Sequence, residues 1–325
     1  MMRQWNSVIV WLMTAALASI GGAASAQPFP TMPIRIIMPQ APGALADVAA
    51  RMVAQKMSQT MGQAVLIENR PGAGVVVAAQ AVLRSNADGH AMLLTGSGTA
   101  VSVSLFKSLP YDIVEDFASV STMASFDLVL LASSDSRFNS IAEAIAYARS
   151  NPGKLNIGTL AVGTTQYLAV ELLRMRAGID VQTVPFKGSG PLITTLRSNE
   201  VQLAIDIIPS VMSQIRSGTI RVLAVTSSRR FVGLPNTPTF LESGIAGYEV
   251  SSWNGLSVRA GTPQWIIDRL NKEIVAAVSA PDVKKKLAEL GADARPSTPE
   301  QMRELLVTDI AKWKTVIERA KIERQ

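Results

Sequence analysis

One pattern of short strands, glycine-rich loops and helices occurs twice in this chain of 325 residues. Each copy holds three short β-rich apolar runs, with apolar residues at helical spacing between them. The runs span residues 34–38, 64–68 and 91–95 in the first copy and residues 155–158, 181–185 and 201–206 in the second. The landmarks match at a nearly constant offset, since Gly43 precedes Gly163 by 120 residues and Gly74 precedes Gly190 by 116. The chain therefore contains two copies of one βαβαβ unit.

This alternation predicts an α/β fold with two lobes, each a mostly parallel sheet flanked by helices. Ligands of such sheets bind beyond the carboxyl ends of the strands, where both copies place their glycines. Glycine N–H groups can approach an anion, and a helix that begins beside the loop adds about half a positive charge. One such loop would be ordinary turn chemistry. Four loops in matched pairs favour two anion-binding lobes that face each other across a cleft.

The residue types that are missing exclude several classes of function. The chain has no cysteine and a single histidine, His90, so Cys/His zinc sites, thiol catalysis and histidine proton relays are excluded or nearly so. The motifs GxSxG, GxxxxGK[ST] and GxGxxG are absent from the sequence, which removes the signals of serine hydrolases, P-loop enzymes and dinucleotide-binding domains. The net charge of +6 is dispersed and few aromatics accompany it, which disfavours nucleic acid. We expect a binding protein without metal or cofactor.

A few residues remain as candidates for chemistry. Asp47 and Asp206 lie beside predicted cleft loops, so a secreted hydrolase with paired carboxylates is an alternative, although each is as readily a helix cap or a loop brace. We interpret His90, which follows Asp88 and Gly89, as a surface residue beside a turn. Trp253 is interpreted as a packing residue, in the core or between the lobes.

The N-terminus has the pattern of a secretory signal peptide. Arg3 precedes an uncharged run at residues 8–20, and small residues follow it up to Ala26. This run of 13 residues is shorter than the roughly 18 to 20 that are needed to cross a bilayer. We predict cleavage after Ala26 and export to the periplasm, where the absence of cysteine is no handicap for a chain of this size.

Several stretches along almost the whole chain carry a family resemblance. They are Pro-Ile-Arg-Ile-Ile at 33–37, Pro-Gly at 42–43 with Asp47 and Ala-Arg at 50–51, Glu-Asn-Arg-Pro-Gly-Ala-Gly at 68–74, Asp-Gly at 88–89, Leu-Pro-Tyr-Asp at 109–112 with Asp-Phe at 116–117, Asn-Pro-Gly-Lys-Leu at 151–155, Pro-Phe-Lys-Gly at 185–188, and Ser-Trp at 252–253 followed by Gly-Thr-Pro at 261–263. Together they resemble the Bug family, the extracytoplasmic solute receptors of tripartite tricarboxylate transporters.

The resemblance implies a type II periplasmic-binding-protein fold whose two lobes close around a small organic acid. We expect residues 1–26 to be the signal peptide, residues 27–126 with 250–325 the first lobe, and residues 127–249 the second. In the family, the loop after the first strand grips a carboxylate through backbone amides and ordered water, and the second lobe adds a Gly/Ser/Thr loop. Carried over to this chain, the ligand-binding residues are Gln40, Gly43, Ala44, Ala46, Asp47, Gly96, Ser97, Thr99, Thr159, Gly163, Thr164, Thr165 and Asp206.

The chain departs from the family pattern in its loops. Gln40 stands where an aromatic residue is common, Ala44 replaces a second glycine, and Ala46 replaces a frequent small hydroxyl residue. Tyr167 stands where histidine is common, and residues 160–162 of the second-lobe loop are apolar. These departures predict a pocket that is partly suited to an apolar or aromatic acid.

The expected mechanism is capture of an anionic solute by neutral donors of both lobes, with a hinge near residues 124–127 and 234–252. The partners that this implies are a small organic acid and either the membrane subunits of a transporter or a sensor kinase. Transport, signalling and, less favoured, hydrolysis by Asp47 and Asp206 remain the three alternatives.

Overall fold

The computed structural model describes residues 29–43, 45–72 and 75–325. The predicted signal peptide and Ala44 lie outside the described residues. Within the part that is described, no helix is long and apolar enough to pass through a bilayer.

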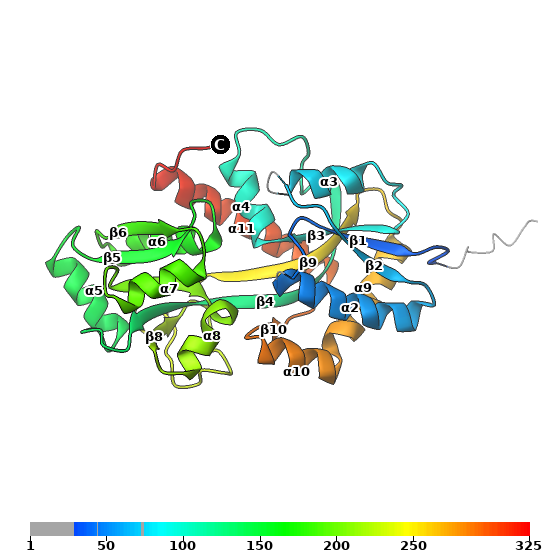
Figure 1. Ribbon diagram of the computed structural model, residues 1–325. Coiled ribbons are helices and arrows are strands. Elements are labelled where there is room, and N and C mark those ends of the chain that lie inside the picture. The colour runs from blue at the N-terminus through cyan, green and yellow to red at the C-terminus, as the bar shows by residue number, and fades with distance from the viewer. Residues whose placement is uncertain (1–28, 44, 73–74) are drawn as a thin grey trace, which may run out of the picture.

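A strand of 17 residues, β4 (Phe117–Ser133), runs through the middle of the molecule and belongs to both of its sheets (Figure 1). From Phe117 to Asp127 it pairs antiparallel with β9 (Ser251–Arg259). From Leu128 onward it pairs antiparallel with β7 (Leu203–Ile207) and β8 (Ile220–Val225) instead. The exchange of partners at Asp127 and Leu128 coincides with the hinge expected near residues 124–127.

The first sheet has the strand order β2-β1-β3-β9-β4, and β10 pairs with the other edge of β4. β1 is parallel to both β2 and β3, whereas β9 runs antiparallel to β3 and β4. Its remaining strands are β1 (Ile34–Met38), β2 (Val65–Asn69), β3 (Ala91–Gly96) and β10 (Asp293–Ala294).

The second sheet has the strand order β6-β5-β7-β4, with β8 on the far edge of β4. β5 is parallel to β6 and β7. Its strands besides β4 are β5 (Asn156–Leu160), β6 (Gln182–Phe186), β7 (Leu203–Ile207) and β8 (Ile220–Val225). Both sheets are thus mixed, because the crossing strands β4 and β9 run against the parallel strands beside them.

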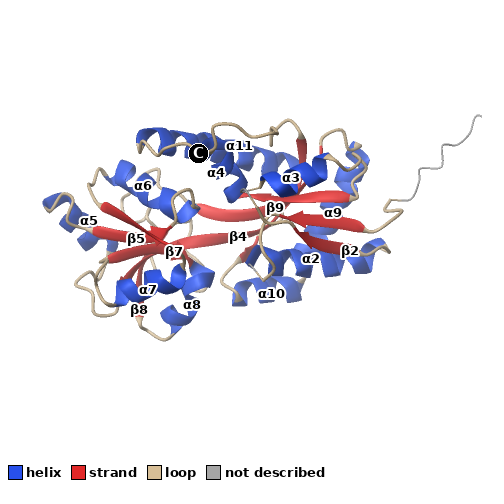
Figure 2. Ribbon diagram, turned by 45° about the horizontal axis from the view of Figure 1, so that its top comes forward, coloured by secondary structure: helices blue, strands red, loops and turns tan. Residues whose placement is uncertain are grey.

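Helices cover both faces of both sheets (Figure 2). They are α2 (Leu45–Met61), α3 (Val76–Leu83), α4 (Ser97–Leu105), α5 (Ile141–Ser150), α6 (Thr165–Ala177), α7 (Ser189–Arg197), α8 (Ile208–Arg216), α9 (Gln264–Ser279), α10 (Pro281–Glu289) and α11 (Pro299–Arg319). Buried side chains of α3, α4, α6 and α11 share one continuous apolar cluster, which joins the two sheets on one face. The opposite faces hold separate clusters, one with α2 and α9 and one with α7 and α8.

The α/β fold predicted from the repeat is confirmed, and its six strands lie within two residues of the predicted runs. Two helix ends follow from local chemistry. Gly62 has φ +70° directly after α2, and Gly178 has φ +61° as the C-cap of α6, the left-handed conformation that glycine adopts without a Cβ penalty.

The interpretation of His90 as a surface residue is wrong. The residue is 8% exposed, Phe29 packs against its ring at 5.0 Å between centroids, and its Nε2 accepts a hydrogen bond from Thr31 N–H. The segment before β1 covers it, and no local pattern in the sequence reveals that contact. Trp253 is 3% exposed within the shared apolar cluster, as expected of a packing residue.

Candidate functional site

The parallel strands of the two sheets end at the same stretch of β4. In the first sheet, β3 ends at Gly96, which pairs with Asn254 of β9, and Asn254 pairs in turn with Ala124 of β4. In the second sheet, β7 ends at Ile207, which pairs with Leu128, four residues further along β4. The strand-to-helix loops of both copies therefore converge on the middle of the molecule, where ligands bind in open α/β sheets.

The loop after β1 is held in shape by Asp47. Gly43 has φ +84° and its N–H donates to Asp47 Oδ2 over 3.0 Å. Asn69 donates to Asp47 Oδ1 over 2.9 Å, and Arg51 donates to both carboxylate oxygens, over 2.8 and 3.1 Å. Asp47 is 2% exposed, so its carboxylate braces the loop from behind.

The ionised form of the Asp47 carboxyl is strongly favoured over the protonated form. Burial alone would raise its pKa, but the hydrogen bonds from Arg51, Asn69 and Gly43 outweigh burial and lower the pKa to about 2. Arg51, which is not among the predicted ligand-binding residues, is thus the partner that keeps Asp47 ionised and neutralises it. A carboxylate in this state is a poor general acid.

Two further predicted residues of this loop differ in their exposure. Ala46 is 8% exposed and its side chain joins the apolar cluster beneath α2, so only its backbone is left for a ligand. Gln40 is half-buried, its carbonyl accepts a hydrogen bond from Asn69, and its Oε1 is buried with no partner among the described residues.

The start of α4 is fixed to the returning strand β9. Ser97 Oγ accepts a hydrogen bond from Trp253 N–H over 2.9 Å, and Thr99 Oγ1 accepts one from Gly96 N–H over 3.2 Å. A Cβ at Gly96 would lie 2.2 Å from the carbonyl oxygen of Trp253, so this close approach requires glycine. The hydroxyls of Ser97 and Thr99 therefore position the helix terminus.

Gly98 was not among the predicted ligand-binding residues. It is exposed in the first turn of α4, and a Cβ there would meet nothing within 4 Å. N–H groups in the first turn of a helix have no partner within the helix and carry the positive end of its dipole. The signal for Gly98 was its place directly after a strand and Ser97.

The loop between β5 and α6 is the first part of the candidate site that comes from the second sheet. Thr164 caps α6: its Oγ1 accepts a hydrogen bond from Tyr167 N–H over 3.2 Å and donates to the carbonyl of Ala161. Thr165, the first residue of α6, is 7% exposed. Gly163 has φ +87°, and a Cβ there would lie 2.5 Å from Leu105 Cδ2 of α4. This loop thus rests against a helix of the first sheet.

Two buried oxygens of the second sheet are unsatisfied. Thr159 and Asp206 are both 0% exposed, and neither Thr159 Oγ1 nor Asp206 Oδ2 has a hydrogen-bond partner among the described residues. The other oxygen, Asp206 Oδ1, accepts from Ile207 N–H over 2.7 Å and from Gln166 Nε2 over 3.3 Å. Burial raises the pKa of Asp206, and the nearby Ser189 hydroxyl, together with the hydrogen bonds from Ile207 and Gln166, offsets the rise only in part.

The residues described by the structure contain no cluster of three or more His, Asp or Glu side chains with the geometry of a metal site. Arg51, the cation at the first loop, is bound to Asp47. The donors available to an anion are therefore backbone N–H groups, hydroxyls and amides.

Comparison with known proteins gives one consistent result. Residues 49–322 match the family model TctC, described as the tripartite tricarboxylate transporter family receptor. Among curated proteins, BugT of Bordetella pertussis is 35% identical over 304 residues, which cover 93% of each chain.

Among solved structures, three relatives share the fold along their whole length. A protein of R. palustris, Rpa4515 with adipate, has a TM-score of 0.76 and 32% identity and covers 91% of this chain and 99% of its own. MatC of Rhodopseudomonas palustris, solved with bound malate, has a TM-score of 0.71 and 30% identity over 89% of this chain and 100% of its own. The periplasmic binding protein BugD has a TM-score of 0.73 and 30% identity over 91% and 100%.

Proposed function

Because the chain belongs to the tripartite tricarboxylate transporter receptor family, we propose that it captures a small organic acid between two lobes and passes it to membrane subunits of such a transporter. The family is one of solute-binding receptors, so the hydrolase alternative is dropped. The adipate and malate of the solved relatives are both dicarboxylates, and they indicate the class of acid. The lobes of this proposal are residues 27–126 with 250–325, and residues 127–249.

The observation that carries the proposal is the set of unsatisfied buried oxygens at the converging strand ends. Gln40 supplies one from the first sheet, and Thr159 and Asp206 supply two from the second. Buried polar atoms are nearly always paired, and a polar solute that enters between the sheets would pair them. A threonine hydroxyl and a reoriented glutamine amide can donate to a carboxylate, and Asp206 can accept from a hydroxyl or a protonated group of the solute.

The affinity that such a site can reach is moderate. Each hydrogen bond to a charged carboxylate contributes roughly 1.5 to 3 kcal/mol. Four to six of them, less the cost of ordering and closure, support a Kd in the micromolar range, about −8 kcal/mol. In this proposal Gly98 and Gly163 offer N–H groups, while Asp47, which binds the Gly43 N–H, and Ser97, Thr99 and Thr164 hold those loops in place.

Isothermal titration of residues 27–325 with C4 to C8 mono- and dicarboxylates tests the proposal. We expect at least one acid to bind, and Gly43→Val and Gly163→Val to weaken it at least tenfold. Gly244→Val is the matched control, because Gly244 has the same left-handed φ of +86° and open space around it. Binding of a neutral sugar and of no acid would contradict the proposal.

The destination of the solute separates transport from signalling. We propose periplasmic export through the N-terminal segment, with cleavage after Ala26. If the receptor feeds a transporter, deletion of its gene abolishes uptake of the radiolabelled acid. If it feeds a sensor kinase, uptake persists and the transcriptional response to the acid is lost.

A further inference from the structure

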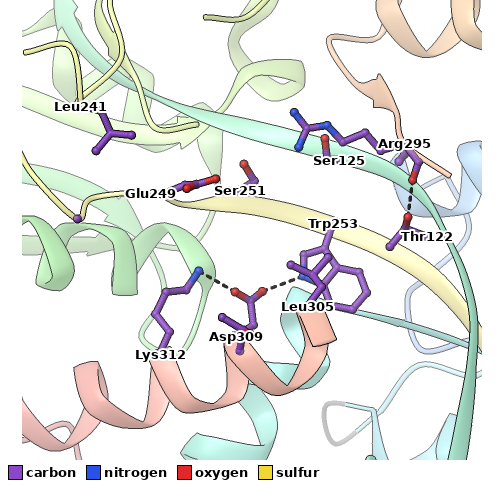
Figure 3. A pocket seen from close by; sticks show the side chains of 13 residues that line it. Thr122, Ser125, Leu241, Glu249, Ser251, Trp253, Arg295, Leu305, Asp309 and Lys312 are labelled. Atoms are coloured by element: carbon purple, nitrogen blue, oxygen red, sulfur yellow. Dashed lines mark hydrogen bonds and ion pairs between the residues drawn. The ribbon is translucent and has the colours of Figure 1, made fainter. Parts of the chain in front are cut away.

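A cavity of about 410 Å³ lies between α11 and the middle of β4 and β9 (Figure 3). Its walls come from both strands, from the segment before β9, from the residue after β10 and from α11. The lining includes Ser125, Leu241, Trp253, Arg295, Leu305 and Lys312. None of the predicted ligand-binding residues lines it. The cavity is therefore separate from the loops described above.

Two polar groups in this cavity have no partner among the described residues. Ser125 is 4% exposed and its Oγ is unpaired, and Arg295 Nε is buried and unpaired as well. Both side chains line the cavity (Figure 3). Thr122 Oγ1 donates to the carbonyl oxygen of Arg295 and so fixes its backbone. A guanidinium and a hydroxyl that stand together are two donors for one anionic oxygen group.

The charge of Arg295 is only partly compensated. Its nearest carboxylate is Asp293, at 3.9 Å from Nη2, and Asp293 also lies 3.6 Å from Arg229. One carboxylate is thus shared by two guanidinium groups. Buried Asp127 also interacts with the charge of Arg295. Arg295 Nε nevertheless has no hydrogen-bond partner among the described residues, so the guanidinium can still donate to an anion.

The opposite wall of the cavity is neutral and partly apolar. Asp309 accepts hydrogen bonds from Trp253 Nε1 over 2.8 Å, and Lys312 Nζ lies 2.7 Å from its other oxygen. Leu241 and Leu305 are 38% and 36% exposed at the cavity. Glu249 stands exposed at the rim and disfavours a second negative charge there.

We propose that this cavity is a second binding site, selective for small monocarboxylic acids with an apolar body. The carboxylate is held by Arg295 and Ser125, and the body lies along Trp253, Leu241 and Leu305. Its volume falls within the range of small-molecule sites, about 300 to 1,000 Å³. The proposal does not depend on what binds at the strand-end loops.

Indole NMR signals provide a direct test, with benzoate as the probe. Residues 27–325 contain three tryptophans, Trp253, Trp265 and Trp313, and Trp253→Phe assigns the signal of interest. We expect benzoate to shift the Trp253 Nε1 signal saturably, and adipate at the same concentration to shift it at least tenfold less. An excess of adipate should leave the benzoate Kd unchanged.

Variants decide whether the shift comes from this cavity. Arg295→Gln should weaken benzoate at least tenfold, and Ser125→Ala about threefold to fivefold. Arg229→Gln is the matched control, because it removes the other guanidinium at Asp293 and lines no part of the cavity. If Arg295→Gln lowers Tm, the benzoate Kd of Ser125→Ala is the measurement that tests the proposal. The absence of a shift, an unchanged Kd in folded Arg295→Gln, or competition by adipate would overturn the proposal.

Discussion

Gly163 of the β5–α6 loop lies against Leu105 in the last turn of α4, so that a Cβ on the glycine would stand 2.5 Å from Leu105 Cδ2. One residue belongs to the second sheet's connections and the other to the first sheet's. Only the far end of one flexible side chain stands in the way of a Cβ, so the contact can be perturbed without unfolding the protein. It offers a way to test whether binding depends on the approach of the two sheets.

Gly163→Ala should lower both stability and ligand affinity. The left-handed φ of +87° costs an alanine about 1 kcal/mol in the free energy of unfolding. Contact of the new methyl with Leu105 should weaken binding of the tightest acid about threefold to tenfold. Urea unfolding and calorimetry measure the two effects.

Gly244→Ala is the control for this change, since φ is +86° and no atom lies within 4 Å. It should cost the same stability and leave affinity unchanged. Adding Leu105→Ala to Gly163→Ala should restore affinity. Equal affinities in all three variants would show that the contact plays no part in binding.

Asp47→Asn should weaken the bracing of the first loop. It removes charge-assisted bonds to Arg51, Asn69 and Gly43, for a loss of about 2 kcal/mol at pH 7. The pKa of Asp47 is about 2 in the folded protein, below the ordinary 3.8. Its stabilisation is therefore complete above about pH 4 and disappears as the pH falls toward 2. Urea unfolding between pH 2 and 5 should show the wild type converging on the variant; a constant gap would contradict the assignment.

Asp206→Asn should act in the opposite direction. Burial raises the pKa of Asp206, so its ionised form destabilises the fold once the pH exceeds that raised value. An asparagine keeps the acceptor for Ile207 and Gln166 and loses the charge. We expect a gain in stability at pH 7 that vanishes below about pH 4. Asp135→Asn, at an exposed position, should change stability little, and a loss of stability in Asp206→Asn would refute the sign.

Thr159→Val compares an unpaired buried hydroxyl with a paired one. Thr159 Oγ1 has no partner among the described residues, so its removal should stabilise the unliganded protein by about 1 kcal/mol and reduce affinity for the acid. Thr226 is equally buried, but its Oγ1 donates to the carbonyl of Val250 and accepts from Leu128 N–H. Thr226→Val should destabilise by about 1 to 3 kcal/mol. Thermal unfolding with and without ligand distinguishes the two.

The strands and glycine loops were predictable because they are encoded locally. Residues 34–38 and the glycines at positions 62 and 178 carry their signals within one turn or one strand. The length of β4 could not be predicted in this way. Its apolar run belongs to two sheets, and its pairing partners change at Asp127. Neither the exchange nor the antiparallel direction of β9 follows from periodicity.

The site was predictable as a set of loops and less so as a set of contacts. Gly43 and Gly163 could be named from the repeat. The hydrogen bonds that satisfy the Asp47 carboxylate, in contrast, include one from Asn69, 22 residues away in the sequence. Likewise, Ser97 bonds to Trp253 over a separation of 156 residues. Such pairings arise from tertiary structure, and a single sequence offers no local pattern for them. The direct contact of Asp47 with a ligand stays a prediction.

The continuity of β4 has a further consequence for how this protein can be divided. One unbroken strand, β4, pairs with β9 through its first part and with β7 through its second part. A cut at Asp127 would therefore leave unpaired backbone groups at a strand edge in each fragment. Neither fragment is a module that can be cloned, swapped or inherited alone. Because both copies depend on this one strand, we expect them to unfold as a single cooperative unit.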